Sequence, residues 1–456
     1  MDTFDIAIVG GGFSGIYAAS RLADEGISVA IIEGGEGLGG NLRSRFWNGY
    51  WIDLGVHNFD MRKKHAALFI EEILQDSLIT TNGFNYASTV DTSWTVGCEQ
   101  PDFHKDEDFC ARVMAELKHG LDSNRFDPVN ESSYVGYLTA KYGELLSEKL
   151  IDMVTKIIGG DPCGLAVDSR NALSFIERPV IGPESKMIQY KETSQYWNER
   201  IGVSRLAMTA QLSDPDKGTI VGYPQGKAML TFCERAKLKL EEKGVRLYLD
   251  TMVDRLRRSR DLSILGNERN TIGAQKVFWS LPEIFLSKAL GIDDCLSPMN
   301  RVVGTCFFVF EVPAKNITNL DYINDYSSKR EVFRYGNQGV FSGQINEEGN
   351  TFILAEVWGH PATFASKLTT EFANIVWRNI LDIGFVKGIN SYKALNFFST
   401  PVAFTLPLIG WRDQYQQYDS LVESQISHLF RIGHGFRGRN SFIEFFENDL
   451  KEKLLN

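Results

Sequence analysis

Several features that would assign the chain to a particular class of protein are missing from its 456 residues. No run of about 18 apolar residues occurs, so we expect no helix that spans a membrane. Lys and Arg number 48 against 58 Asp and Glu, and the net charge of −10 argues against non-specific binding to nucleic acid. The 7 histidines lack the spacing of zinc ligands, so no metal site is expected.

Cysteine is also scarce, and its pattern carries no motif. The 6 cysteines are scattered along the chain without a Cys-x-x-Cys pair. The first predicted strand begins at about Phe4, which leaves no room for a signal peptide. We therefore expect a cytoplasmic protein whose thiols are reduced.

The composition that is present is typical of a folded protein with several packed units. Hydrophobic residues make up 43% of the chain and charged residues 23%, which is the usual balance of globular domains. A length of 456 residues exceeds one ordinary hydrophobic core and fits two or three packed units.

The most informative segment is an apolar run that ends in a glycine turn. Gly10, Gly12 and Gly15 form a Gly-x-Gly-x-x-Gly pattern, which a helical pattern follows over residues 16–25. Gly10 allows the sharp turn, Gly12 lets the backbone approach a pyrophosphate, and Gly15 lets the helix pack on the strand. A strand, a tight turn and a helix in this order predict a dinucleotide site.

An acidic residue completes this pattern. A second apolar run over residues 28–32 ends in Glu33, whose carboxylate can accept hydrogen bonds from a ribose diol and disfavours a 2′-phosphate. Phe13 and Ser14 lie at the start of the helix, where exposed amides and the helix dipole favour a dianion. The residues predict an adenine dinucleotide without a 2′-phosphate, and both FAD and NAD meet that description.

The segment after the second predicted strand distinguishes the two cofactors. It contains Gly39, Gly40 and Arg43, and an Asp-x-Gly turn that ends at Gly55 follows. The chain here resembles the flavoprotein superfamily of amine oxidases, protoporphyrinogen oxidases, phytoene desaturases and UDP-galactopyranose mutases. The resemblance implies non-covalent FAD, with backbone amides and a guanidinium near the flavin diphosphate. At Gly40-Asn41 the segment resembles that of the mutases more than that of the oxidases.

The same resemblance implies roles for two later segments. The backbone at Val253 would contact the adenine, after a strand that returns to the dinucleotide domain. Gly438 and Arg439 resemble a C-terminal flavin motif, so Arg439 is expected near the diphosphate or the isoalloxazine. The run 433–435, Gly-His-Gly, offers a competing alignment of that motif.

The resemblance and the apolar patterns together predict an α/β fold. Residues 1–60, 217–300 and 400–456 would form a discontinuous, Rossmann-like FAD-binding domain. Helix-like spacing of apolar residues predicts a mainly helical insertion over 61–216. Residues 301–399 contain segments rich in β-branched and aromatic residues, which predict a second, mixed β-sheet for the substrate domain.

His57 is the candidate catalytic residue. It lies in a Gly-x-His-x-Phe segment that is similar to a loop of the mutases, where the histidine lies over the flavin. It would hydrogen-bond or gate the isoalloxazine, and an ordinary histidine pKa of about 6.5 suits proton transfer. A loop histidine that bonds a backbone carbonyl is an equally good interpretation.

Arginines in the predicted substrate regions bear on the substrate. Each one alone is interpreted as an ordinary surface or inter-domain arginine, but two that converge on the cavity would support an anionic substrate such as a nucleotide sugar. They are Arg178, Arg200, Arg205, Arg301 and Arg334.

Three functions are compatible with these patterns. The leading one is an FAD-dependent oxidoreductase of the amine oxidase or protoporphyrinogen oxidase type, in which a small-molecule substrate transfers a hydride to flavin N5. The second is a redox-neutral isomerase similar to UDP-galactopyranose mutase in surface polysaccharide biosynthesis, although Phe445 and Glu447 stand where the mutases carry tyrosine and aspartate. The third is a flavin-binding protein without turnover.

Overall fold

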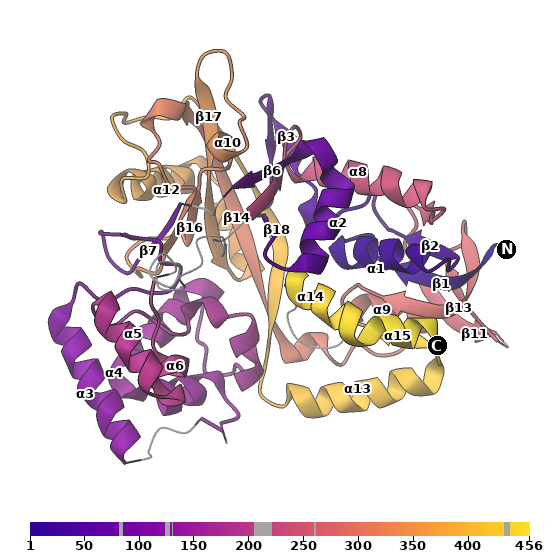
Figure 1. Cartoon of the computed structure of the whole chain (residues 1–456), viewed down its shortest axis with the longest axis horizontal. Coiled ribbons are helices and arrows are strands. Elements are labelled where there is room, and N and C mark those ends of the chain that lie inside the picture. Colours follow the sequence, from indigo (N-terminus) through magenta and orange to yellow (C-terminus); the bar gives the residue numbers. More distant parts are fainter. Residues whose placement is uncertain (82–84, 124–127, 130, 205–220, 260, 433–437) are drawn as a thin grey trace.

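The computed structural model describes residues 1–81, 85–123, 128–129, 131–204, 221–259, 261–432 and 438–456. Figure 1 shows three regions: a sheet flanked by helices that holds both ends of the chain, a second sheet beside it, and a group of helices below the second sheet. This arrangement confirms the α/β fold with a Rossmann-like domain, a helical region and a second mixed sheet that the sequence predicts.

The first sheet collects strands from three distant parts of the chain. Its inner strands run parallel, and only the hairpin at one edge is antiparallel. In spatial order the strands are β10 (Arg246–Tyr248), β2 (Val29–Ile32), β1 (Thr3–Val9), β13 (Thr271–Trp279), β12 (Leu262–Gly266) and β11 (Arg255–Ser259), and β19 (Leu429–Arg431) also pairs with β13.

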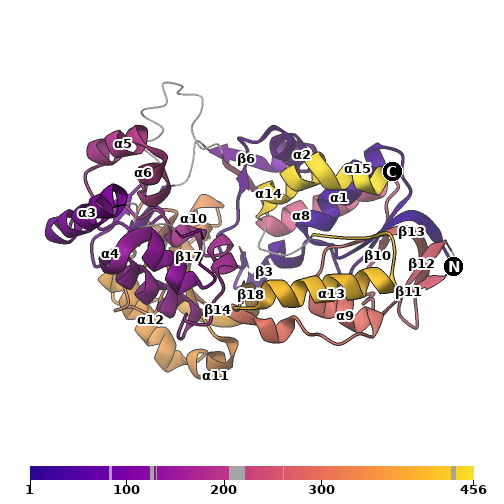
Figure 2. The same cartoon turned by 90° about the horizontal axis from the view of Figure 1, so that it is seen from below.

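Helices cover both faces of this sheet, as a parallel sheet requires. Ile6 and Ile8 of β1 point to one core, whereas Ala7 and Val9 point to the other. Figure 2 shows the two helical layers on opposite sides of the strands. The first layer contains α1 (Phe13–Asp24), α2 (Lys64–Leu74), α8 (Met229–Glu242), α14 (Arg439–Phe445) and α15 (Lys451–Leu455), and the second contains α9 (Glu283–Leu290) and α13 (Trp411–Gln425).

The second sheet is built around two long antiparallel strands. Each has 14 residues; one forms an edge of the sheet, the other lies next to it, and α12 (Thr370–Asp382) packs on one face. In spatial order the strands are β18 (Ala394–Pro407), β14 (Asn300–Pro313), β17 (Asn350–Gly359), β16 (Arg334–Gly336), β15 (Tyr322–Asp325), β7 (Tyr86–Thr89) and β8 (Thr95–Val96).

The remaining described elements link these parts. Short strands form two small sheets, which comprise β3 (Arg45–Trp47) with β4 (Tyr50–Ile52), and β5 (Phe59–Asp60) with β9 (Val221–Pro224) and β6 (Leu78–Thr81). The other helices are α3 (Glu107–Asp122), α4 (Tyr134–Ile158), α5 (Glu184–Thr193), α6 (Gln195–Arg200), α10 (Gln338–Phe341) and α11 (Phe364–Lys367). None of these described helices combines the length and the apolar character that a membrane crossing requires.

The predicted domain bounds stay a prediction, but three strands do not follow them. β7 and β8 belong to the second sheet although they come from residues 61–216, the predicted helical insertion. β18 runs across the predicted bound at residue 400. Edge pairing explains the first case, since a short strand joins whichever open sheet edge the chain passes.

A buried ion pair holds the turn between two strands of the second sheet. Asp325 is fully buried and accepts hydrogen bonds from the Arg330 guanidinium and from the Tyr335 hydroxyl. Removing one partner of such a pair leaves the other charge buried without compensation, at a cost of about 3–5 kcal/mol. We expect Asp325→Ala to lower the free energy of unfolding by that amount in urea titrations.

The matched control is the exposed pair of Lys393 and Glu348, whose side chains are 48% and 74% exposed. Solvent screens such a pair, so Lys393→Ala is expected to cost less than about 1 kcal/mol. Equal losses for Asp325→Ala and Lys393→Ala would contradict the structural role of the buried pair.

Candidate functional site

The glycine turn after β1 is packed so tightly that side chains are excluded at two of its three glycines. Gly10 has a φ of +104°, a conformation that L side chains rarely adopt, and its N–H donates to the Ile32 carbonyl at 2.9 Å. A Cβ at Gly15 would lie 2.0 Å from the Gly10 carbonyl oxygen. The first turn of α1 therefore sits directly on the end of β1.

At Gly12, unlike at Gly10 and Gly15, there is room for a side chain. A Cβ added there would meet no atom within 4 Å, so the space beside it is open. Gly12 is also the N-cap of α1 and has no side chain to cap the helix. Phe13 and Ser14 follow in the first turn, where unsatisfied amides and the helix dipole favour an anion.

Glu33 stands at the end of β2, beside this turn. Its carboxylate accepts hydrogen bonds from the N–H of Gly11 and from the N–H of Gly35, both at 2.7 Å. A carboxylate has about four acceptor positions, so two remain for other donors. The predicted contact with a ribose stays a prediction that this geometry permits.

The second glycine segment packs against the first one. The Gly39 N–H donates to the Gly11 carbonyl at 2.7 Å, and a Cβ at Gly40 would lie 3.4 Å from the Gly12 Cα. Asn41 follows and is exposed. The structure thus brings together two glycine segments that about 30 residues of sequence separate.

The Arg43 side chain points toward Glu36, in the loop that follows β2. Its guanidinium pairs with Glu36 at 2.8 Å, and the Arg43 side chain is 30% exposed. An exposed pair of this kind is worth little, so it can exchange for another anion. The predicted phosphate contact of Arg43 remains a prediction.

Val253 lies in the loop after β10 and is buried. Backbone bonds tie this loop to the acidic end of β2, because the Thr251 N–H donates to the Glu33 carbonyl and the Asp250 N–H to the Gly35 carbonyl, both at 2.9 Å. The loop that contains Val253 therefore lies at the same end of the sheet as Glu33, where the resemblance implies the adenosine half.

His57 lies between three distant segments and is held neutral. Burial, then the nearby charges of Arg439 and Arg334, lower its pKa to about 3, although hydrogen bonds with the Asn41 and Leu54 backbone act in the opposite direction. Its Nε2 is buried and has no hydrogen-bond partner among the described residues. Desolvation and the two arginines both disfavour the imidazolium in this structure. The catalytic role of His57 stays a prediction.

Arg439 begins α14 next to the His57 loop, with Gly438 as the extended N-cap. Its Nη2 donates to the Asn58 carbonyl at 2.7 Å, and its guanidinium stacks 5.6 Å from the centre of the Phe59 ring. Burial lowers the pKa of Arg439 to about 10, and the charge of Asp53 opposes that shift. No carboxylate in the described part of the chain forms an ion pair with this guanidinium. The competing run 433–435 lies outside the described residues.

Asp53 is a functional candidate that the sequence patterns do not single out. It is buried and accepts hydrogen bonds from the Ser44 hydroxyl at 2.5 Å and the Tyr223 hydroxyl at 2.6 Å. Burial raises its pKa to about 6, while these bonds and the charge of Arg439 lower it. Asp53 thereby ties three segments together, and its position in an Asp-x-Gly turn was the only signal for it.

The second sheet supplies a polar group that faces Gly55. A Cβ at Gly55 would lie 3.6 Å from Glu356 Oε1, and Glu356 accepts from Trp358 Nε1 at 3.0 Å. Arg334 pairs with Glu356 at 3.5 Å and lies over the ring of Trp358. Of the five arginines considered in the sequence, only Arg334 lies beside His57; Arg178 and Arg200 line another cavity, Arg301 bonds the Asp161 carbonyl, and Arg205 lies outside the described residues.

Comparison with known proteins agrees with this geometry. Residues 8–73 match the family model of the NAD(P)-binding Rossmann-like domain. A curated 4,4′-diapophytoene desaturase (4,4′-diaponeurosporene-forming) of Staphylococcus aureus (strain MRSA252) is 28% identical over 140 residues, which span 30% of this chain and 25% of that protein. The aligned part is thus about a quarter of the length of the curated relatives.

Two solved structures share the fold along the whole chain. A protein described as a protoporphyrinogen oxidase of Exiguobacterium sp. 255-15 has a TM-score of 0.68 and 17% identity, over 100% of this chain and 99% of that one. A reduced UDP-galactopyranose mutase has a TM-score of 0.71 and 15% identity, over 100% and 97%. The chain therefore has the fold of these flavoproteins, and the resemblance stated from the sequence is confirmed at the level of fold.

The neutral state of His57 can be tested by its titration. The pKa of about 3 in the folded chain lies below the value of about 6.5 in an unfolded chain. The stability that this difference contributes is present above pH 6.5 and is lost as the pH falls toward 3. We expect the ¹³C-histidine NMR signal of His57, assigned with His57→Gln, to show no titration between pH 5 and 8 (about 6.5 being the midpoint in urea). A midpoint near the unfolded value in the folded protein would contradict the described burial.

Proposed function

We propose that the chain binds FAD non-covalently along the carboxyl ends of β1 and β2. The observation that carries this proposal is the open space at Gly12, which faces the N-terminus of α1 and the second glycine segment. Gly10, Gly15, Gly39 and Gly40 shape this cradle, and a side chain at Gly12 would fill it.

The polar groups around the cradle also suit FAD. The amides of Phe13 and Ser14 would receive the diphosphate, together with Arg43 and Asn41. Glu33 would bond the ribose, and the Val253 backbone would meet the adenine. At the other end, Gly438 and Arg439 would meet the flavin half, since Arg439 is partly buried without a carboxylate partner in the described residues.

We further propose that the chain is an FAD-dependent oxidoreductase of the amine oxidase or protoporphyrinogen oxidase type. When bound, FAD would accept a hydride at N5 from a small-molecule substrate and return the electrons to an acceptor. The chain's own contribution is to orient both partners. In the neutral imidazole of His57 the Nδ1–H donates to backbone carbonyls, so its unpartnered Nε2 is left as a hydrogen-bond acceptor.

A flavin-dependent sugar-nucleotide isomerase is the second candidate. It is favoured by the contact between His57 and the Asn41 backbone, since both segments resemble the mutases. The C-terminal helix argues against it. Glu447 accepts a hydrogen bond from the Tyr17 hydroxyl at 2.6 Å, and Phe445 packs on the core of the first sheet, so neither supplies the polar groups that a mutase would use there.

Two glycine variants separate cofactor binding from folding. Gly12→Val adds a side chain where no protein atom lies within 4 Å, so we expect a folded protein that has lost its flavin. Gly15→Val places a Cβ 2.0 Å from the Gly10 carbonyl oxygen, so we expect a lower melting temperature as well. Visible absorbance, FAD released on denaturation and circular dichroism measure the outcome.

The parent protein is the control for both variants. A parent that releases no FAD on denaturation would refute the proposed cofactor. A Gly12→Val protein that keeps full FAD occupancy would place the cofactor elsewhere on the chain.

Redox behaviour distinguishes the oxidoreductase from the isomerase. An oxidoreductase changes the oxidation state of its flavin in every cycle, so the substrate should bleach the visible band without oxygen and an acceptor should restore it. We expect bleaching by one member of a panel of amines and sugar nucleotides. Anaerobic stopped-flow absorbance measures the rate, and His57→Ala should slow it while FAD stays bound.

The same panel is then given to protein whose flavin has been reduced with dithionite. Isomerised product that forms only in these reduced samples would favour the sugar-nucleotide isomerase over the oxidoreductase. A flavin that no member of the panel bleaches, with no product in either state, would support a flavin-binding protein without turnover.

A further inference from the structure

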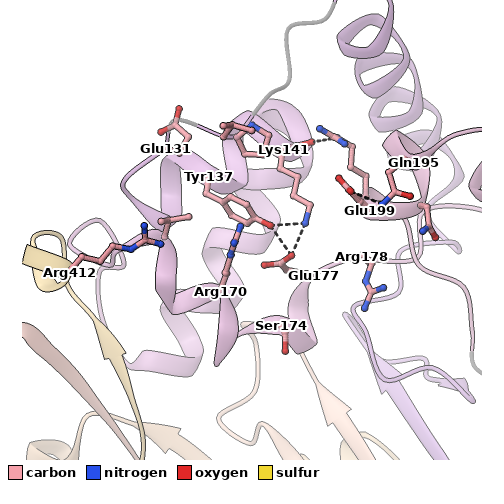
Figure 3. Close-up of a pocket in the computed structure, with 15 residues that line it drawn as sticks. Glu131, Tyr137, Lys141, Arg170, Ser174, Glu177, Arg178, Gln195, Glu199 and Arg412 are labelled. Carbon is pink, nitrogen blue, oxygen red and sulfur yellow. Dashed lines mark hydrogen bonds and ion pairs between the residues drawn. The ribbon is translucent and has the colours of Figure 1, made fainter. Parts of the chain in front are cut away.

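The helical region contains a cavity that the proposed FAD site does not use. It has a volume of about 730 Å³ and lies between α4, α6 and the first turn of α13 (Figure 3). A second space of about 370 Å³ adjoins it and shares Tyr137, Arg170, Ser174 and Glu177 with it. No residue of the glycine segments, and neither His57 nor Arg439, lines either space.

The lining carries more positive than negative charge. Five cationic side chains and three carboxylates face the cavity. Some of this charge is already satisfied within the protein. The Lys141 Nζ donates to Glu177 Oε2 and to the Tyr137 hydroxyl, each at 2.7 Å, as the dashed lines of Figure 3 show. Arg412 is held by two hydrogen bonds to Asp168.

Two of the cations form no ion pair within the described part of the chain. Arg170 is exposed, and its guanidinium lies 5.4 Å from the centre of the Tyr137 ring. Arg178 is exposed as well and has a φ of +57°, which is unusual for a residue with a side chain. Its N–H donates to the Tyr142 hydroxyl at 3.0 Å, and this bond holds the strained backbone in place. The structure therefore presents to the cavity two positive charges that form no ion pair within the described residues.

The Glu177 carboxylate has one buried oxygen without a hydrogen-bond donor among the described residues. That oxygen is Oε1, whereas Oε2 of the same carboxylate is fully engaged. A buried acceptor of this kind costs free energy until a donor reaches it. Ser174, Gln195 and Asn198 also line the cavity and offer polar groups to ligand hydroxyls, while an anionic group of the same ligand would meet Arg170 and Arg178.

We propose that this cavity binds an anionic carbohydrate, a molecule that carries a phosphate or carboxylate together with hydroxyl groups. The volume lies within the range of about 300–1,000 Å³ that is usual for small-molecule sites. Only Pro128, Val129 and Val167 contribute apolar side chains to the lining, which disfavours a lipid or hydrocarbon ligand. The proposal does not depend on FAD binding, because the two sites share no residue.

The test is isothermal titration calorimetry on the purified full-length protein with its flavin. Glucose 1-phosphate and glucuronate are the two probes, and the tighter one identifies the phosphate or the carboxylate as the preferred anion. Inorganic phosphate, which lacks the sugar, and glucose, which lacks the anionic group, are the control ligands. We expect Arg170→Ala and Arg178→Ala each to weaken the tighter probe by about tenfold, the usual effect of losing a charged hydrogen bond. Both residues are exposed, so both variants should fold.

Arg112→Ala is the matched control, since Arg112 is an exposed arginine of α3 that does not line the cavity. Its affinity for the probe should equal that of the parent. The proposal is overturned if neither sugar acid binds, if inorganic phosphate binds as tightly as glucose 1-phosphate, or if the Arg170→Ala and Arg178→Ala proteins bind like the parent. Flavin content is read from the visible absorbance of each sample, so a protein without FAD that still binds the sugar acid contradicts only the proposed cofactor.

Discussion

The close approach of α1 to the end of β1 is the constraint on which the rest of the site depends. A side chain at Gly15 would overlap the Gly10 carbonyl, so the helix reaches this position only because residue 15 is glycine. That approach fixes where the first amides of α1 point and leaves Gly12 beside open space. The second glycine segment then closes on the first through the bond from Gly39 to Gly11.

The charged groups that act on His57 come from distant parts of the chain. The charges of Arg439 and Arg334 both lower the pKa of His57, although Arg334 also pairs with Glu356 at 3.5 Å. Asp53 compensates only in part, because burial raises its own pKa to about 6. Desolvation and the two arginines together disfavour the imidazolium form of His57.

The sequence predicted the local parts of this architecture well. The glycine turn, the helix that follows it and the acid at the end of β2 depend on residues within about 30 positions, so spacing alone reveals them. The second sheet was also predictable, since β14 and β17 are long apolar strands. The membership of β7 and β8 in that sheet was not, because nothing in a short strand states which distant edge it will pair with.

The sequence by itself thus determined a dinucleotide fold and the residues that line its turn. The tertiary structure alone decided the state of His57, whose pKa depends on Arg334 and Arg439, which lie some 280 and 380 positions further along the chain. It also decided the roles of Asp53 and Glu447, which engage Tyr223 and Tyr17 respectively. The physical reason is that desolvation and Coulomb interactions depend on distance in space, which folding sets and which sequence separation does not record.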